Sequence, residues 1–296
     1  MKRSRASAHR KQGSCRPSRI DRDALTLWTM GDKYLENGAK SGPVHVLVTG
    51  ASGELGGALA LTYARTGARL SLWGRDADRL SKVAEACTSA GAAAAHLRGL
   101  DLTDIDAALA AIALEDAAAP FDIAVFASGL GDIRAEAVLV ESATLVAQLG
   151  LVNFVAPAAL AAELGGRMAA RGHGRIVLIG SAAAFHALPF AVAYAASKAG
   201  LARFADALRI NLQPLGVQVT LVSPGFIDTA AARQVPGPKP MAMSAQQAAT
   251  RIVAAAAKGQ AHLVMPWPFR LLRLIDRVLP GALRDRLLRR LTPPGR

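Results

Sequence analysis

Aromatic residues and cysteines are scarce in this chain of 296 residues. Phenylalanine, tyrosine and tryptophan make up 5% of it, and the cysteines are Cys15 and Cys87. Two isolated cysteines form neither a disulfide framework nor the paired spacing of a metal site, so we expect no metal. They favour a reduced, cytoplasmic protein. The chain is nevertheless 52% hydrophobic, which is enough for a substantial core.

Acidic residues are missing from the first 20 positions and rare in the last 27. The net charge of +13 divides into +7 for residues 1–20 and +6 for residues 270–296, so the residues between them are neutral. A neutral body argues against nucleic acid as a partner of that region. The positive charge is therefore a property of the two end segments.

No long uninterrupted apolar run is present. Residues 1–24 contain almost no apolar residues, which excludes a secretory signal there. This segment could be a transit peptide, a disordered tail, or sequence that precedes a true start at Met30. We predict that residues 1–40 are a basic, disordered tail. The longest apolar region, residues 176–196, contains His186 and Pro189, so we expect no transmembrane helix.

The most informative stretch is residues 175–200. A short β-branched run at 176–179 predicts a buried strand, and Ser181 lies just beyond its carboxyl end. Tyr194 and Lys198 follow, one turn apart on one face of a predicted helix that continues to about residue 212. We expect the three side chains to converge at the carboxyl end of a strand, where open parallel sheets bind ligands.

This trio suits the protonation of a carbonyl oxygen. A free tyrosine has a pKa of about 10, and a nearby ammonium favours the phenolate, so Lys198 would lower the pKa of Tyr194 toward neutrality. Ser181 would hold the carbonyl oxygen in place. The alternative is a buried tyrosine and a surface lysine on an ordinary helix.

Residues 44–65 predict a strand, a glycine-rich turn and a helix. The glycines permit a tight turn, and the N-terminus of the helix presents unpaired N–H groups to a pyrophosphate. The turn consists of Thr49, Gly50, Ala51, Ser52, Gly53, Glu54, Leu55 and Gly56.

Strands and helices alternate through the rest of residues 41–262. Repeated right-handed crossovers of this kind predict a single doubly wound Rossmann domain, an α/β fold with a mostly parallel sheet of about seven strands. A loop is predicted at 230–243. The predicted strands are 44–48, 70–73, 92–98, 121–126, 176–179 and 218–222, and the main helical regions are 76–90, 135–170, 194–212 and 245–258.

The spacing of Ser181, Tyr194 and Lys198, joined to the glycine turn, resembles the short-chain dehydrogenase/reductase family over about residues 44–260. The resemblance implies hydride transfer between a nicotinamide cofactor and a ketone or alcohol. It implies that Tyr194 protonates the oxygen, that Lys198 tunes Tyr194 and binds the nicotinamide ribose, and that Ser181 orients the carbonyl. Asn153 resembles the family's helix asparagine, which supports a proton relay.

The same resemblance implies cofactor contacts along the strand ends. Asp101 and Leu102 resemble the stretch beside the adenine ring, and residues 223–229 resemble the segment along the nicotinamide. The implied set is Thr49, Gly50, Ser52, Gly53, Glu54, Leu55, Gly56, Arg75, Asp101, Leu102, Gly129, Tyr194, Lys198, Pro224, Gly225, Ile227 and Thr229.

Two positions depart from the family pattern. Compact members usually have glycine where this chain has Glu54, whose carboxylate must point away from a pyrophosphate. They usually have Asn-Asn-Ala-Gly where this chain has Phe126-Ala127-Ser128-Gly129, so the asparagine side chains that brace the central strands are missing.

The end of the second predicted strand bears on the choice of cofactor. An acidic residue there would hold the ribose 2′-OH of NAD, but this chain has Gly74 followed by Arg75. A guanidinium suits a 2′-phosphate, so we predict NADP(H) over NAD(H) and reduction in the cell. An NAD-dependent alcohol dehydrogenase working oxidatively and a non-catalytic, cofactor-binding scaffold are the alternatives.

The loops predicted to flank the substrate are apolar. Residues 263–296 predict a basic amphipathic extension of two helices, split at Pro280 and Gly281. Residues 267–291 are a candidate contact with an anionic membrane, and the alternative is packing on the domain or on a partner subunit. We therefore expect a ketone on an apolar substrate such as a lipid, peripheral membrane association, and a homo-oligomer. The apolar flanking residues are Phe185, Leu188, Phe190, Phe226, Ile227, Met241 and Met243.

Overall fold

The structure is a computed structural model that describes residues 42–131, 141–234 and 237–290. The predicted basic tail, residues 1–40, lies outside these ranges, as do residues 135–140 of the predicted long helix and Leu291 of the predicted extension. The division of the chain at residues 40 and 262 stays a prediction.

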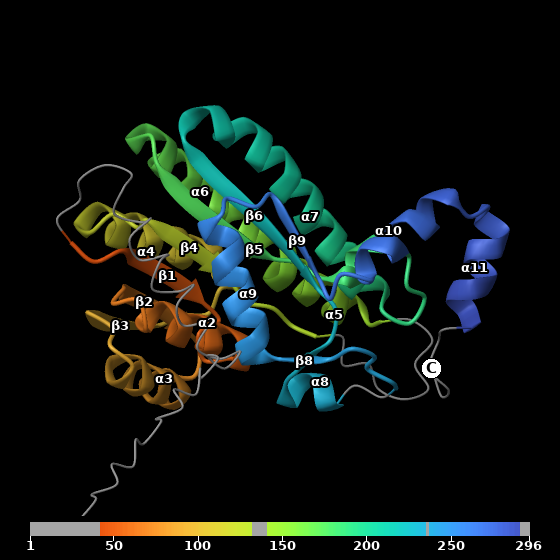
Figure 1. Cartoon of the computed structure of the whole chain (residues 1–296), viewed down its shortest axis with the longest axis horizontal. Coiled ribbons are helices and arrows are strands. Elements are labelled where there is room, and N and C mark those ends of the chain that lie inside the picture. The colour runs from red at the N-terminus through yellow and green to blue at the C-terminus, as the bar shows by residue number, and fades with distance from the viewer. Residues whose placement is uncertain (1–41, 132–140, 235–236, 291–296) are drawn as a thin grey trace, which may run out of the picture. The chain divides into compact units, whose positions relative to one another are not determined.

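Seven strands form one parallel sheet (Figure 1). Their order is β3-β2-β1-β4-β5-β6-β9, so the chain grows outward in both directions from the β1–β4 pair. This arrangement confirms the predicted doubly wound α/β fold. The strands are β1 (His45–Thr49), β2 (Arg69–Gly74), β3 (Ala94–Gly99), β4 (Ile123–Phe126), β5 (Gly174–Ile179), β6 (Val217–Pro224) and β9 (His262–Met265).

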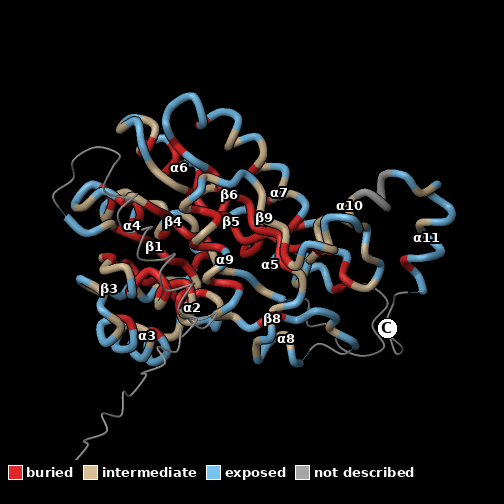
Figure 2. Tube along the Cα trace, viewed as in Figure 1, coloured by how far each residue is buried: buried red, intermediate tan, exposed pale blue. Residues whose placement is uncertain are grey.

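Helices pack in two layers on the sheet (Figure 1). One layer holds α2 (Glu54–Ala64), α3 (Ala77–Ser89) and α9 (Ala245–Ala257). The other layer holds α4 (Ile105–Ala118), α6 (Ala156–Arg171) and α7 (Val192–Leu212), with α5 (Ala143–Gly150) against α7. Because both faces are covered, the central strands are buried on both sides, which explains their continuous apolar sequences (Figure 2).

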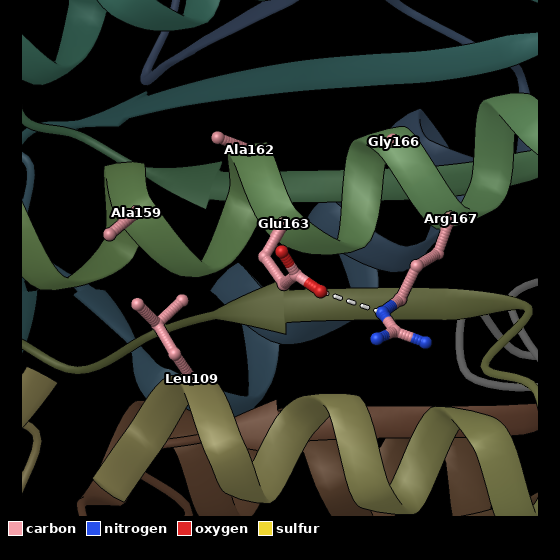
Figure 3. A pocket seen from close by; sticks show the side chains of 6 residues that line it. All are labelled: Leu109, Ala159, Ala162, Glu163, Gly166 and Arg167. Carbon is pink, nitrogen blue, oxygen red and sulfur yellow. Dashed lines mark hydrogen bonds and ion pairs between the residues drawn. The ribbon is translucent and has the colours of Figure 1, made fainter. Parts of the chain in front are cut away.

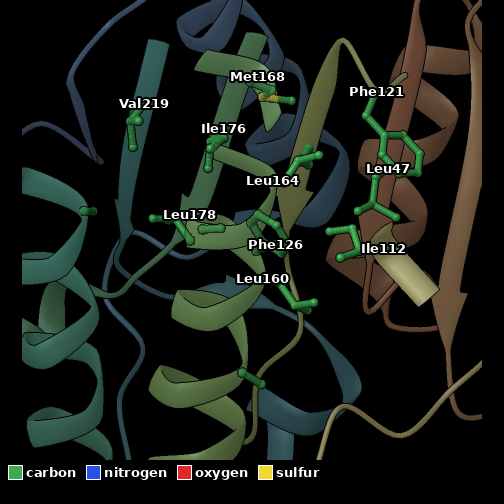
Figure 4. Packing of buried hydrophobic residues seen from close by; sticks show 14 of the residues in the cluster. Leu47, Ile112, Phe121, Phe126, Leu160, Leu164, Met168, Ile176, Leu178 and Val219 are labelled. Carbon is green, nitrogen blue, oxygen red and sulfur yellow. The ribbon is translucent and has the colours of Figure 1, made fainter. Parts of the chain in front are cut away.

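The core lies largely between the sheet and the layer of α4, α6 and α7. Leu47, Phe126 and Leu178 from the strands pack with Ile112 of α4 and Leu160 of α6 (Figure 4). All of these side chains are buried. The core therefore fixes the strand ends that carry the predicted site residues.

One described helical stretch, Ala143–Arg171, is long and apolar enough to cross a membrane by length and composition. It consists of α5, one π-helical turn η1 (Leu151–Val155) and α6. Ala156, Leu160 and Met168 on this stretch belong to the core, so packing on the sheet accounts for its apolar character.

Several short elements differ from the predictions. The predicted loop at 230–243 contains α8 (Ala230–Gln234), because Thr229 Oγ1 caps it by accepting a hydrogen bond from Ala232 N at 3.1 Å. Short strands β7 (Ile227–Asp228) and β8 (Met243–Ser244) close this segment at its base. The 3₁₀ turns are η2 (Ala182–Phe185) and η3 (Gln213–Leu215).

Two helices follow the sheet at the carboxyl end of the described chain. They are α10 (Phe269–Val278) and α11 (Gly281–Arg290), separated at Pro280 as predicted. Their described side chains are mostly exposed (Figure 2). This confirms a helical C-terminal extension.

Candidate active site

Ser181, Tyr194 and Lys198 lie at the carboxyl end of β5. Ser181 follows β5 and begins η2, where its Oγ accepts a hydrogen bond from Ala183 N at 3.1 Å. Tyr194 is half-buried in the first turn of α7, and Lys198 is one turn further on. Lys198 Nζ donates to the carbonyl oxygen of Ile179, the last residue of β5, at 2.9 Å. This bond ties the catalytic helix predicted from the sequence to the strand that carries Ser181.

Asn153 connects the end of β4 to the same helix. It is fully buried in the π-helical turn η1, an irregularity that often occurs at functional sites. Its Oδ1 accepts from Leu130 N at 2.8 Å, and its Nδ2 donates to Leu130 O at 3.0 Å. A Cβ placed on Gly129 would lie 3.3 Å from Asn153 Oδ1 and 3.4 Å from Lys198 Nζ. Gly129 is therefore where the amide, the ammonium and the β4 backbone meet.

The amide of Asn153 also bears on the missing asparagines after β4. The two bonds to Leu130 hold the backbone just beyond β4 in place, and Nδ2 also reaches Ser197 Oγ at 3.4 Å. In this chain, one buried side chain from α5–α6 braces the turn that the family usually braces from within β4.

Burial lowers the pKa of Lys198 to about 8 from an ordinary value of 10.5. Desolvation disfavours the ammonium, and the Ile179 carbonyl offers it only one hydrogen bond. A lysine with this pKa is still mainly protonated at pH 7. At this pH the ammonium one turn from Tyr194 is therefore charged, and burying that charge lowers the stability of the folded protein.

We expect Lys198→Met to raise the free energy of unfolding at pH 7 by about 2 kcal/mol. The lowered pKa corresponds to about 3 kcal/mol, less about 1 kcal/mol for the lost bond to Ile179. Between pH 8 and 10.5 the unfolded chain holds a proton that the folded chain has released, so wild-type stability rises with pH across this window. Urea unfolding at pH 7 and pH 10 measures both effects.

The control is Lys258→Met, because Lys258 is exposed at the end of α9. It should change neither the stability at pH 7 nor its pH dependence. A Lys198→Met protein that is less stable than wild type at pH 7, with an unchanged urea slope, would contradict the buried-charge argument.

Glu141 is a site residue that the sequence analysis missed. Its side chain is buried, and Oε1 accepts a hydrogen bond from Ala193 N at 3.3 Å, next to Tyr194. Ala191, the N-cap residue of α7, makes no side-chain capping bond. Glu141 therefore caps the helix from a distant segment, which no local capping signal could reveal.

The glycine turn forms a close-packed cradle at the carboxyl end of β1. Gly50 has φ +67°, and a Cβ there would lie 2.8 Å from the backbone of Ser128. A Cβ on Gly56 would lie 2.1 Å from Gly50 O. Helix α2 thus starts directly on the turn, with Gly53 as its N-cap and its first N–H groups free for a phosphate. These backbone features fit a dinucleotide.

Glu54 bonds to the segment that follows β6. Its Oε1 accepts a hydrogen bond from Ala230 N at 2.6 Å, at the start of α8. The bond joins two segments that are both predicted to contact the cofactor and are 176 residues apart in sequence. The departure from the family glycine therefore has a structural role.

Gly74 and Arg75 lie at the end of β2, beside the turn. A Cβ on Gly74 would lie 2.8 Å from Ser52 Oγ, so a larger residue there would require the Ser52 side chain to move. Arg75 is 61% exposed, and its guanidinium lies 3.9 Å from Asp101 Oδ2. The pKa of Asp101 is lowered, mainly by a hydrogen bond from Thr103 N–H and also by Arg75. Arg75 and Asp101 thus face each other, and Leu102 is buried next to them.

The segment after β6 is held by the last strand and by α10. Gly225 N donates to Met265 O at 2.7 Å. A Cβ on Gly225 would lie 2.9 Å from the ring of Phe269. Pro224, Gly225, Ile227 and Thr229 therefore run from β6 to α8 along this edge, and the C-terminal extension packs directly beneath them.

A surface hollow also lies outside this site. About 540 Å³ lies between α4 and α6, beside Leu109, Ala159 and the Glu163–Arg167 ion pair (Figure 3). None of its lining residues belongs to the predicted site. Within residues 42–131, 141–234 and 237–290, no group of three histidine, cysteine or acidic residues is placed to hold a metal.

Comparison with known proteins agrees with this geometry. Residues 44–239 match the family model for short chain dehydrogenases. An uncharacterized oxidoreductase of Myxococcus xanthus is 34% identical over 83% of this chain and 96% of its own length. A hydroxysteroid 11-beta-dehydrogenase 1-like protein B of Xenopus laevis is 31% identical over 77% of this chain and 81% of its own.

A solved structure of a short-chain dehydrogenase also resembles this chain. The short-chain dehydrogenase from Sphingobium yanoikuyae in complex with NADPH is 26% identical, with a TM-score of 0.70 over 85% of this chain and 97% of its own. The family model and the relatives together establish an oxidoreductase acting on CH–OH or C=O groups. The chain therefore belongs to the short-chain dehydrogenase/reductase family.

Proposed function

We propose that this enzyme is an NADP(H)-dependent reductase of a ketone on an apolar substrate, with Tyr194 as general acid. The observation that carries the proposal is the buried ammonium of Lys198. It lies one turn from Tyr194 and is aimed at the end of β5, beside Gly129. Burying an ammonium costs stability, so its retention here needs an explanation. Its charge favours the phenolate form of Tyr194.

Bound reduced nicotinamide would supply the hydride. Ser181 Oγ holds the carbonyl oxygen, and the Tyr194 hydroxyl gives its proton to that oxygen. The Lys198 ammonium stabilises the phenolate that remains, and its bond to Ile179 fixes its position. Asn153 bonds to Leu130 after β4 and to Ser197 on α7, which holds these two segments together and keeps the reacting groups aligned.

The cofactor site fits a dinucleotide with a 2′-phosphate. The turn from Gly50 to Gly56 would hold the pyrophosphate on backbone N–H groups, and Asp101 would lie at the adenine end. The exposed guanidinium of Arg75 supports NADP(H), because it can pair with a 2′-phosphate and Gly74 offers no carboxylate to repel it.

We expect Arg75→Asp to weaken NADPH binding by at least about tenfold, since it replaces an attractive charge with a repulsive one. NADH binding should change by less than about threefold, because NADH lacks the 2′-phosphate. Fluorescence titration with each nucleotide measures this. Arg65→Asp, the same charge change at the far end of α2, is the control. Equal loss for both nucleotides, or equal loss in the control, would contradict the assignment.

Two observations support an apolar substrate. Phe226 and Met241 are exposed apolar side chains near the site segments. One relative is named a hydroxysteroid dehydrogenase-like protein, a name that refers to a lipid ketone or alcohol. Both observations favour a bulky apolar ketone over a small charged one.

The C-terminal helices carry a second part of the proposal, peripheral contact with an anionic membrane. Trp267 is 69% exposed and Val278 is 79% exposed, and Leu271, Leu283 and Leu287 are exposed as well. Arginines 284, 286, 289 and 290 lie among them on α11. Exposed apolar side chains interspersed with arginines suit the surface of an anionic bilayer.

We expect the double variant Leu283→Glu, Leu287→Glu to lose most of its co-sedimentation with vesicles containing phosphatidylserine. The matched control is Leu114→Glu, Ile210→Glu, two apolar residues on α4 and α7 that are at least as exposed. These substitutions spare Phe269, whose contact with Gly225 a truncation after residue 266 would remove. Equal binding of wild type and both variants would refute the membrane contact.

Cytoplasmic localisation and a homo-oligomer remain part of the proposal. Size-exclusion chromatography with light scattering measures the oligomeric state directly.

A further inference from the structure

A second pocket lies beside α7, next to the turn η2 that follows Ser181. It has a volume of about 200 Å³ and is enclosed by α7, η2, β6, β9 and α10. Its α7 wall is formed at positions 199, 202, 203 and 206, which lie further around the helix than Tyr194, with Ala202 one turn beyond Lys198. None of its lining residues is in the predicted catalytic or cofactor set.

Two guanidinium groups from separate elements line this pocket. Arg203 comes from α7 and Arg273 from α10. Among the residues that the structure describes, neither forms an ion pair within 4.0 Å, whereas arginines such as Arg98 and Arg171 have an acidic partner. The pocket therefore holds two cations whose charge no ion pair compensates.

Arg273 is fixed in place by its neighbours. Its guanidinium carbon lies 5.7 Å from the centre of the Phe185 ring, and Nη1 lies 3.4 Å from His262 Nδ1. Because a guanidinium has donors only, Nδ1 must accept, so the proton of the neutral imidazole is on Nε2. Nε2 then donates to the buried Ser223 Oγ at 2.9 Å.

The pocket's charges select the ligand. Burial, and next the charge of Arg273, lower the pKa of His262, which agrees with a neutral imidazole. With Asp206 as the only acidic lining residue, the pocket carries a net charge of +1. That balance suits a monoanion better than a phosphate dianion. The remaining walls are Phe185, Leu221 and small alanines, which suit an apolar body.

We propose that this pocket binds a small monocarboxylate, with Arg203 and Arg273 on the carboxylate and the apolar wall on its short body. Arginine forks match the geometry of a carboxylate. The pocket volume equals that of roughly six waters, enough for an acid of a few carbon atoms. The ligand would bridge α7 and α10. The proposal does not rest on the reductase chemistry, although Phe185 is also one of the residues expected on the substrate side.

The test is a ligand-observed NMR titration of the full-length protein with butyrate. Saturable binding with a dissociation constant of about 1–10 mM is expected, as for one charge pair and a small apolar contact. Arg203→Gln and Arg273→Gln should each weaken it at least about tenfold. Asp206→Asn should strengthen it by removing a like charge. Arg209→Gln, which removes an arginine of α7 that bonds to Gln213 outside the pocket, should leave it unchanged.

Three further measurements decide the ligand class and the place of binding. Butyramide, which lacks the charge, should not bind, and inorganic phosphate should bind more weakly than butyrate. Saturating NADPH should not displace butyrate. The proposal is overturned if butyrate does not saturate, if the Arg203 and Arg209 variants behave alike, if butyramide or phosphate binds as well, or if NADPH competes. Because no readout depends on turnover, the result is separate from that for the reductase activity.

Discussion

Replacing Tyr194 with phenylalanine is expected to lower the rate of ketone reduction by about 10²–10⁴-fold, the usual contribution of a positioned general acid. The phenol is the one group on the first turn of α7 that can give a proton to a carbonyl oxygen held by Ser181. The Lys198 ammonium is buried and bonded to Ile179 O, which fixes its position at the end of β5. The measurement is kcat with NADPH and a bulky apolar ketone.

The affinity for NADPH should change little in this variant, since phenylalanine keeps the ring and its packing. Tyr63→Phe is the matched control, because it makes the same chemical change on α2. A Tyr194→Phe enzyme that keeps turnover within threefold of wild type would rule out Tyr194 as the acid. A wild-type protein that binds NADPH but reduces no ketone of a broad panel would favour the non-catalytic scaffold.

The sheet could be predicted because its signals are local. Buried parallel strands are short apolar runs, and helices between them show caps such as Ser244, which begins α9 with a capping box. The handedness of the crossovers is compatible with more than one strand order, so the order β3-β2-β1-β4-β5-β6-β9 is known only from the structure. The last strand, β9, was missed because its apolar run is only three residues long and follows a histidine. Three of its four residues are only half-buried.

The site was predicted where one segment carries it, and missed where two distant segments meet. Tyr194 and Lys198 share a helix face, so their spacing alone places them together. Glu141 caps that helix from 52 residues away, and Glu54 bonds to Ala230 across 176 residues. Tertiary contacts of this kind leave no periodic trace in a single sequence.

The π-helical turn at η1 shows the same limit. Propensity and hydrophobicity predict one continuous helix through Asn153, because an extra residue in a turn changes neither. Only the finished packing shows why it is there. The turn brings the buried amide within hydrogen-bonding distance of both Leu130 and Ser197.

Two neighbouring glycines of α2 offer the sharpest test of the cofactor cradle. Gly56→Ala would place a Cβ 2.1 Å from Gly50 O and 2.7 Å from Gly50 C. Both atoms are backbone, so the helix must move off the turn. We expect a loss of stability of about 1–3 kcal/mol, as for other overpacked sites. NADPH affinity should fall at least about tenfold, because the helix N-terminus no longer faces the phosphates.

Gly57→Ala is the matched control one residue further on. Its Cβ would lie 3.4 Å from Ala51 O and from a methyl of Val83, which is ordinary contact. Alanine is the better helix former, so stability should stay level or rise by up to about 1 kcal/mol. NADPH binding should be unchanged. Urea unfolding and fluorescence titration on both variants separate the two cases. If they bind NADPH equally well, the contact between α2 and Gly50 does not shape the site, and the first two glycines of the turn must be sufficient to hold the phosphates.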